Sequence, residues 1–150
     1  MSVKGKRTIY VGPADGRTCH PLLVEGKVIT TGFLPGELVE RVPTGLTQCD
    51  NASTVFNTEA IIAKEYGGHT DQDVDTPYAV GDFSLAIVVR SGEFVNARVV
   101  AATYTKGQAL ASNGNGQLKA AAGTNADQVL FYCDEALTAS AGDLVRVRKA

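Results

Sequence analysis

The sequence predicts a mainly β protein, a small β-barrel or β-sandwich-like domain with an extended N-terminal arm. Apolar residues occur in short alternating runs, and few segments keep helical spacing for more than two turns. Glycine-centred breaks separate these runs, and Asn113-Gly114-Asn115-Gly116 is typical of a tight hairpin turn because Asn and Gly tolerate positive φ. A closed or nearly closed barrel would hide the edges of so many short strands.

The length and composition indicate one ordinary globular domain. A chain of 150 residues buries roughly two thirds of its unfolded surface. The sequence is 44% hydrophobic and 20% charged, which excludes a disordered or collagen-like chain. We expect the arm to span residues 1–20 and a single β-rich domain to span residues 21–150.

The clearest strand is predicted at residues 83–90, where apolar side chains alternate. Ala86 and Val88 are apolar on the second face, so this strand is expected to be covered on both sides. After the turn Ser91-Gly92-Glu93, residues 94–101 are predicted to return as the second strand of a hairpin. In that strand Val95, Ala97, Val99 and Ala101 would point inward, and Asn96 and Arg98 outward.

Further strands follow from the same alternation. Residues 109–111 and 117–119 are predicted to pair across the Asn-Gly turn, and residues 144–148 form a half-buried strand with a basic outer side. Earlier candidates are residues 7–11, 27–31, 37–42 and 60–64. The stretch 53–65 is compatible with a helix capped by Ser53, but we favour a strand there.

One local pattern occurs four times, as a short turn with Gly, then a polar residue, then a strand. The polar residue is predicted to stay solvated where the strand begins. The copies are Leu34-Pro35-Gly36-Glu37, Ala79-Val80-Gly81-Asp82, Thr105-Lys106-Gly107-Gln108 and Ser140-Ala141-Gly142-Asp143. Their irregular spacing excludes a solenoid or propeller.

Charge and hydropathy exclude several classes of partner. Fourteen basic and sixteen acidic residues give a net charge of −2, which offers no overall positive field for nucleic acid. No apolar stretch approaches the ~20 residues of a membrane span, and no apolar signal segment follows the first residues. We therefore expect no direct nucleic-acid or membrane partner, and assembly in the cytoplasm.

Catalytic and metal-binding patterns are scarce, so we expect no enzyme, cofactor or metal site. Phosphate-loop, zinc-protease and serine-hydrolase motifs are absent, and His20 and His69 fall in polar loops. Cys19, Cys49 and Cys133 are expected to be free thiols, with Cys133 a small buried hydrophobe.

Two charged regions keep alternatives open. Asp71, Asp73 and Asp75 match the first ligands of a calcium loop, but Thr76 replaces the required Gly, which favours a solvated acidic loop. The basic residues near the two ends are either a solvated edge or a contact for an acidic protein surface; they are Lys4, Lys6, Arg7, Arg146, Arg148 and Lys149.

The order of motifs over residues 60–150 resembles the head decoration, or capsid cement, proteins of tailed bacteriophages. Members of that class tend to show YxxGD, RxGExxxA, KGxxLxSxGxGxLK and GDxVxVRxx segments. Here these correspond to Tyr78 with Gly81-Asp82, then residues 90–97, residues 106–119 and residues 142–148.

The resemblance implies a virion protein on the outer surface of the phage head. Such a protein binds the major capsid protein at capsomer junctions, often as a trimer or dimer, and strengthens the expanded shell. We expect the arm and the basic rim to make the contacts, through Lys4, Lys6, Arg7, Ile9, Tyr10, Arg146 and Arg148.

Three other functions remain open. A ligand-binding barrel would need a sizeable apolar pocket, whereas a cement protein would have a filled interior and exposed apolar patches. A tail or minor head protein belongs to the same structural class. An enzyme would depend on Cys19, His20 or the acidic loop at residues 71–75.

Overall fold

The computed structural model describes residues 6, 8–12, 21–50, 59–66, 73–122 and 127–150. These residues form strands and no helix, which confirms the mainly β prediction. The strands are β1 (Tyr10–Gly12), β2 (Leu22–Lys27), β3 (Leu38–Val42), β4 (Gly45–Gln48), β5 (Ile61–Lys64), β6 (Phe83–Val88), β7 (Phe94–Val99), β8 (Ala102–Tyr104), β9 (Ala109–Ser112), β10 (Leu118–Ala120), β11 (Phe131–Cys133), β12 (Leu137–Ala139) and β13 (Asp143–Lys149). Among the described residues, no helix is long and apolar enough to cross a membrane.

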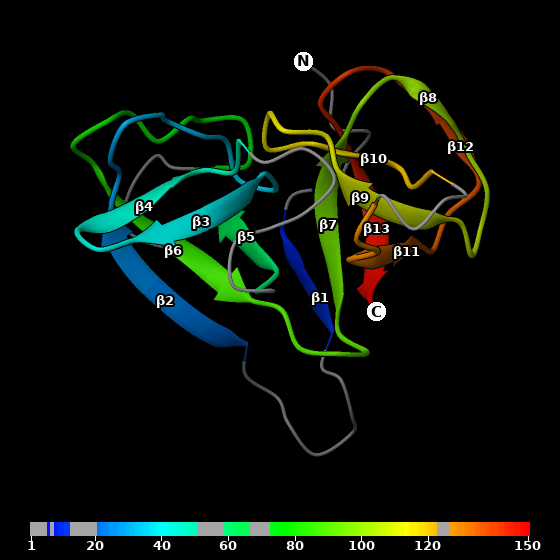
Figure 1. Cartoon of the computed structure of the whole chain (residues 1–150), viewed down its shortest axis with the longest axis horizontal. Helices are drawn as coiled ribbons and strands as arrows, with labels where there is room; N and C mark the ends of the chain where they lie inside the picture. Colours follow the sequence, from blue (N-terminus) through cyan, green and yellow to red (C-terminus); the bar gives the residue numbers. More distant parts are fainter. Residues whose placement is uncertain (1–5, 7, 13–20, 51–58, 67–72, 123–126) are drawn as a thin grey trace.

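Five strands close into a barrel. The pairing runs β7-β10-β9-β11-β13, and β13 returns to β7 in antiparallel register from Asp143↔Val99 to Arg148↔Phe94. Alternate side chains of β7 and β13 fill the interior, because Val95, Ala97, Val145 and Val147 are all fully buried. β8 and β12 form a separate two-stranded ribbon beside the barrel (Figure 1).

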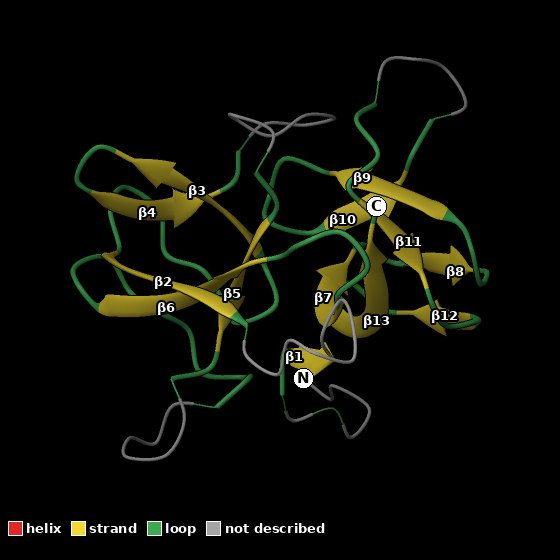
Figure 2. Ribbon diagram, turned by 90° about the horizontal axis from the view of Figure 1, so that it is seen from below, coloured by secondary structure: helices red, strands yellow, loops and turns green. Residues whose placement is uncertain are grey.

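β1 pairs with β7 beside the barrel. The remaining five strands form a second sheet, in the order β2-β6-β5-β3-β4, on the opposite side of the molecule from the barrel (Figures 1 and 2). This sheet curls, since Val28 beyond β2 bridges to Leu46 of β4. Ala86 belongs to the core inside the curl, whereas its neighbour Ile87 belongs to the larger core shared with the barrel. The prediction that this strand is covered on both faces is therefore confirmed around Ala86 and Ile87, whereas Phe83 at the start of the strand is exposed.

The predicted hairpin between residues 83–90 and 94–101 is wrong. The turn exists, with the Glu93 amide donating to the Arg90 carbonyl at 3.0 Å, but the strands on its two sides enter different sheets. β6 pairs with β2 and β5, while β7 pairs with β13, β1 and β10. The connection at residues 89–93 is thus the link between second sheet and barrel.

Asn96 and Arg98 were predicted to face solvent, and this prediction is wrong because both are buried. They do point away from the barrel interior, but the second sheet and adjoining loops cover that side, and Arg98 is only 1% exposed. Its Nε donates to Pro35 O at 2.8 Å, its Nη1 to Gly142 O at 2.8 Å, and its Nη2 to Val74 O. Three backbone carbonyls satisfy the buried guanidinium. Ala101, predicted to point inward, is exposed.

All four predicted glycine turns are present as type II β-turns. Gly36, Gly81, Gly107 and Gly142 have φ between 82° and 98°, which L side chains rarely adopt. In each turn the following polar side chain accepts a hydrogen bond from the first residue's amide, for example Glu37 Oε1 from Leu34 N at 2.6 Å. The predicted solvation is wrong for Glu37 and Asp143, which are buried at 5% and 3% exposure.

The structure contains a fifth copy that sequence analysis treated only as a hairpin turn. Gly92 has φ 87°, and Glu93 Oε1 accepts from Arg90 N at 2.7 Å. Glu93 is fully buried and also accepts hydrogen bonds from the Arg90 side chain, at 3.1 Å from Nε and 3.0 Å from Nη2.

The remaining strand predictions differ in outcome. The hairpin at residues 109–119 is confirmed by antiparallel pairing of β9 with β10, and strands are confirmed at residues 37–42, 60–64 and 144–148. The strand predicted at 27–31 is wrong, because β2 ends at Lys27 and Thr30 has φ 66°. The alternative helix start at Ser53 lies outside the described residues.

Candidate contact surface

The predicted N-terminal contact residues lie partly in the body of the domain. β1 pairs antiparallel with β7, and Asn96 N donates to Ile9 O at 2.8 Å. Ile9 is fully buried in the core, so its side chain is not available for contact in this structure. Lys4, Arg7 and the proposed arm boundary at residue 20 lie outside the described residues.

Two further N-terminal residues make intramolecular bonds. Lys6 forms an ion pair with Glu135, and the Tyr10 hydroxyl donates to Glu93 Oε2 at 2.9 Å. Partial burial, together with the neighbouring Glu93 carboxylate, raises the pKa of Tyr10 to about 12. Tyr10 therefore stays neutral at physiological pH and continues to donate this hydrogen bond.

Arg146 and Arg148 of β13 point to the outside of the barrel, on the face opposite to the buried Val145 and Val147. Arg146 Nε donates to Asp134 Oδ2 at 2.7 Å, so its charge is already paired. Arg148 is exposed and lies between two cross-strand neighbours, Tyr132 of β11 and Phe94 of β7. Of the two predicted basic contacts, Arg148 is the one whose charge faces outward without an ion-pair partner among the described residues.

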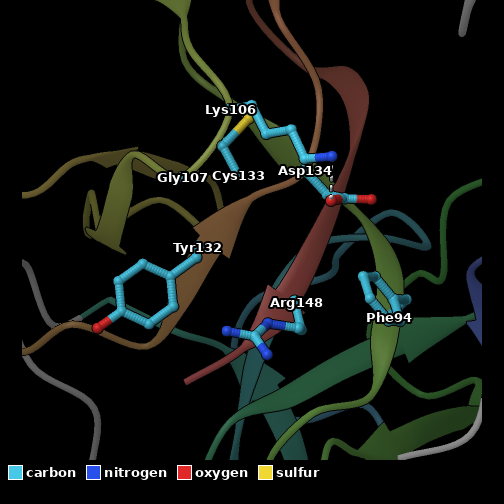
Figure 3. A pocket seen from close by; sticks show the side chains of 7 residues that line it. All are labelled: Phe94, Lys106, Gly107, Tyr132, Cys133, Asp134 and Arg148. Atoms are coloured by element: carbon cyan, nitrogen blue, oxygen red, sulfur yellow. Dashed lines mark ion pairs between the residues drawn. The ribbon is translucent and has the colours of Figure 1, made fainter.

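Arg148 lines an open pocket of about 430 Å³ on the outer surface of the barrel (Figure 3). The lining residues are Phe94, Lys106, Gly107, Tyr132, Cys133, Asp134 and Arg148. Tyr132 and Phe94 are the cross-strand neighbours of Arg148 on its two sides, and all three side chains line the pocket. Of these residues, only Arg148 was predicted from the sequence as a contact residue. Tyr132 could also have been predicted to lie outside, because it alternates with Phe131 and Cys133, which are buried.

Large apolar side chains are also exposed on and beside the second sheet, away from its own core. Leu23 and Phe83 are 47% and 70% exposed, and alternation places both on the outer face of the β2–β6 pair. Tyr66, just beyond β5, is 42% exposed. Leu23 is paired with Ile87 and Phe83 with Lys27, so the two side chains lie toward opposite ends of the β2–β6 pair.

The candidates for chemistry give no assembled site within the described residues. No group of three His, Cys, Asp or Glu side chains there is arranged to hold a metal. Asp73 instead accepts hydrogen bonds from Asp75 N at 2.9 Å and Thr76 Oγ1 at 3.0 Å, which lower the pKa of its carboxyl. Cys19, His20, His69 and Asp71 lie outside the described residues.

The two described cysteines, Cys49 and Cys133, are buried thiols outside any disulfide, as predicted. Burial raises the pKa of the Cys133 thiol, and its Sγ donates to the Glu135 carbonyl at 3.0 Å. A thiol held in the protonated form is a poor nucleophile, so Cys133 acts as part of the core.

Together these observations define an all-β protein with a filled five-stranded barrel and exposed apolar and basic features on its surface. No protein-family model matches the chain, and no curated protein matches its sequence. Its structure is similar to the N base of head fiber gp8.5 of bacteriophage phi29, with a TM-score of 0.55 and 11% identity. The match covers 87% of this chain and 95% of that chain, and at this identity it shows a shared fold.

Proposed function

We propose that this chain is a structural protein of a tailed-bacteriophage head, specifically a decoration protein that binds the outside of the icosahedral shell at capsomer junctions and stabilises it. The observation that carries this proposal is the fold similarity to the phi29 head fiber base, which extends over nearly the whole of both chains. The motif order over residues 60–150 independently resembles the decoration proteins.

The surface of the molecule supports a contact function over a ligand-binding one. The barrel interior is occupied by fully buried side chains such as Val95 and Val145, so the barrel is a packed core. Large apolar side chains are instead exposed on the outside, where Phe83 and Val80 are 70% and 58% exposed. A filled interior with large apolar side chains exposed outside suits docking to another protein better than binding a ligand inside the barrel.

Such a protein needs no catalytic pair or cofactor. Its partners would be the phage major capsid protein and copies of itself, as a trimer or dimer. Binding only to the assembled shell stabilises that shell by linkage, and symmetric repetition multiplies weak contacts. The protein would be assembled in the host cytoplasm and remain on the virion surface, without direct contact to the packaged DNA.

The test is to mix the purified chain with expanded empty heads of the phage that encodes it, pellet the heads, and measure the bound protein. We expect saturable binding at a fixed number of copies per head and a higher disruption temperature of the decorated heads. A globular protein of similar size and charge is the control. Binding that does not saturate, or that equals the control, would contradict the proposal.

A further inference from the structure

Three side chains form one row across the outside of the barrel. In the strand register Tyr132 of β11 is opposite Arg148 of β13, and Arg148 is in turn opposite Phe94 of β7. Figure 3 shows the three side chains around the open pocket, with Arg148 drawn between Tyr132 and Phe94 in this view. All three residues lie on paired strands of the barrel, so the backbone position of Arg148 is fixed by the strand register and not by a loop.

Of the cations at the pocket, Arg148 is the one that forms no ion pair with a described residue. The carboxylate of Asp134 is occupied by Arg146 Nε at 2.7 Å, and Lys106 Nζ lies 3.9 Å from its other oxygen. Arg148 has no ion pair with any described residue, although it lines the same pocket. The pocket thus presents two cations, Lys106 and Arg148, against one carboxylate that is already engaged.

The residues that line the pocket indicate which chemical group it would bind. A planar guanidinium binds a carboxylate through two parallel hydrogen bonds. Tyr132 is 36% exposed and Phe94 is half-buried, so both rings offer apolar surface beside the charge. The lining therefore complements a carboxylate that is adjacent to an apolar or aromatic side chain.

We propose that this pocket docks an acidic side chain, with its apolar neighbour, from a surface segment of the partner protein. This inference rests on the proposed function in one respect, since it takes that partner to be the shell protein. The recognition chemistry itself depends only on Arg148, Lys106 and the two rings. A chain carboxyl terminus would offer the same chemistry as an acidic side chain, and the experiment separates the two.

The first arm needs no phage heads. Backbone amide NMR signals of the full chain are followed while N-acetyl-Phe-Asp-amide is added, with N-acetyl-Phe-Asn-amide as the uncharged match. We expect the Asp peptide to shift signals of Tyr132, Lys106 and Phe94 and to bind at least about tenfold more tightly than the Asn peptide. N-acetyl-phenylalanine, with a free terminal carboxylate, shows whether a chain end is accepted.

Two variants test whether the Asp peptide binds at Arg148. Arg148→Gln is expected to weaken binding of the Asp peptide about tenfold or more, because the bidentate partner is removed. Lys27→Gln, which removes an exposed cation of β2, has the same change in net charge and is expected to leave binding unchanged. The NMR spectrum of each variant checks that it is folded.

Several outcomes would overturn the inference: no shift at peptide concentrations in the tens of millimolar, equal binding of the Asp and Asn peptides, or preferential binding of a single-stranded DNA 12-mer at these residues. The second arm repeats the head-pelleting experiment with Arg148→Gln. If the unsubstituted chain fails to bind heads, the proposed function fails. If it binds heads and Arg148→Gln binds equally well, only the pocket assignment fails.

Discussion

At the scale of single residues, two buried glutamates of the glycine turns have pKa values shifted in opposite directions. Burial raises the pKa of Glu37, and this outweighs its hydrogen bonds from Leu34 and Gln48 and the charge of Arg98. Burial also disfavours the charge on Glu93, but hydrogen bonds from Arg90 and Tyr10 outweigh it and lower the pKa of Glu93. The same turn chemistry therefore gives opposite dependence of stability on pH.

Glu93→Gln and Glu37→Gln test this difference. The depressed pKa of Glu93 adds stability above the unfolded value of about 4.3, and this stability is lost as pH falls through the folded value. The raised pKa of Glu37 adds stability below about 4.3 that is lost as pH rises through the folded value. We expect Glu93→Gln to cost roughly 1–3 kcal/mol at pH 7 and less in acid.

The measurement is urea unfolding of the three proteins between pH 3 and pH 8. The difference between the unsubstituted chain and Glu93→Gln should grow as pH rises, and the difference for Glu37→Gln should change in the opposite sense. Curves that stay parallel for either variant would show that its glutamate does not titrate differently in the folded protein.

At the scale of elements, the type II turns differ in what surrounds their glycines. A Cβ on Gly36 would lie 2.5 Å from Leu144 Cδ2 and 3.2 Å from Arg98 Cγ, whereas a Cβ on Gly107 would meet nothing within 4 Å. Both glycines have similar φ, 92° and 88°, so the backbone strain of a substitution is matched. Comparing Gly36→Ala with Gly107→Ala therefore separates the cost of backbone strain from the cost of steric overlap.

We expect Gly107→Ala to destabilise the protein by about 1–2 kcal/mol, the usual cost of a left-handed conformation for a residue with a Cβ. Gly36→Ala should cost a further ~1–3 kcal/mol because Leu144 is forced to move within the packed core. Denaturant unfolding of both variants measures the difference, and equal losses would show that the core yields to the added methyl without cost.

The sequence was sufficient for elements whose determinants are local. The hairpin at residues 109–119 follows from Gly114 and Gly116, which both adopt positive φ, and the four glycine turns follow from their own residues. It was not sufficient for the pairing of β6 and β7, because alternation sets the faces of a strand but not its neighbours. Nor was it sufficient for residues 27–31, where β2 ends at Lys27 and Val28 instead bridges to Leu46 of β4, a non-local pairing.

The candidate site likewise has one part that the sequence predicts and one part that it does not. Alternation along β13 was enough to place Arg148 on the outside of the barrel. Its position between Tyr132 and Phe94 depends on the registers of β11 and β7 against β13, which join segments far apart in the chain. Arg98 was expected to reach solvent because a charge is seldom buried, and only the tertiary structure supplies the three carbonyls that satisfy it.

At the scale of the whole molecule, Arg98 joins the two halves. It projects from β7 of the barrel and binds Pro35 O, beside the second sheet, and Gly142 O, in the turn before β13. Burial lowers its pKa, against the opposing effect of Glu37 and Asp75, but a guanidinium remains charged at all ordinary pH values.

Arg98→Met is therefore expected to cost about 3–5 kcal/mol, since it leaves buried carbonyls without donors. Arg146→Met is the matched control, because the Arg146 side chain is 42% exposed and its ion pair with Asp134 should contribute within about 1 kcal/mol. Thermal unfolding followed by circular dichroism compares the two. A loss for Arg98→Met no larger than that for Arg146→Met would show that the Arg98 guanidinium does not hold the two halves together.

The closed ring of strands also has a consequence for synthesis. β13 is the strand that joins β11 to β7, so the ring cannot be completed on the ribosome until residues 143–149 have left the exit tunnel. Before that moment the nascent polypeptide carries two open strand edges at once, which are competent to pair with other chains. Translation that stops short of this last segment would release a product prone to aggregate.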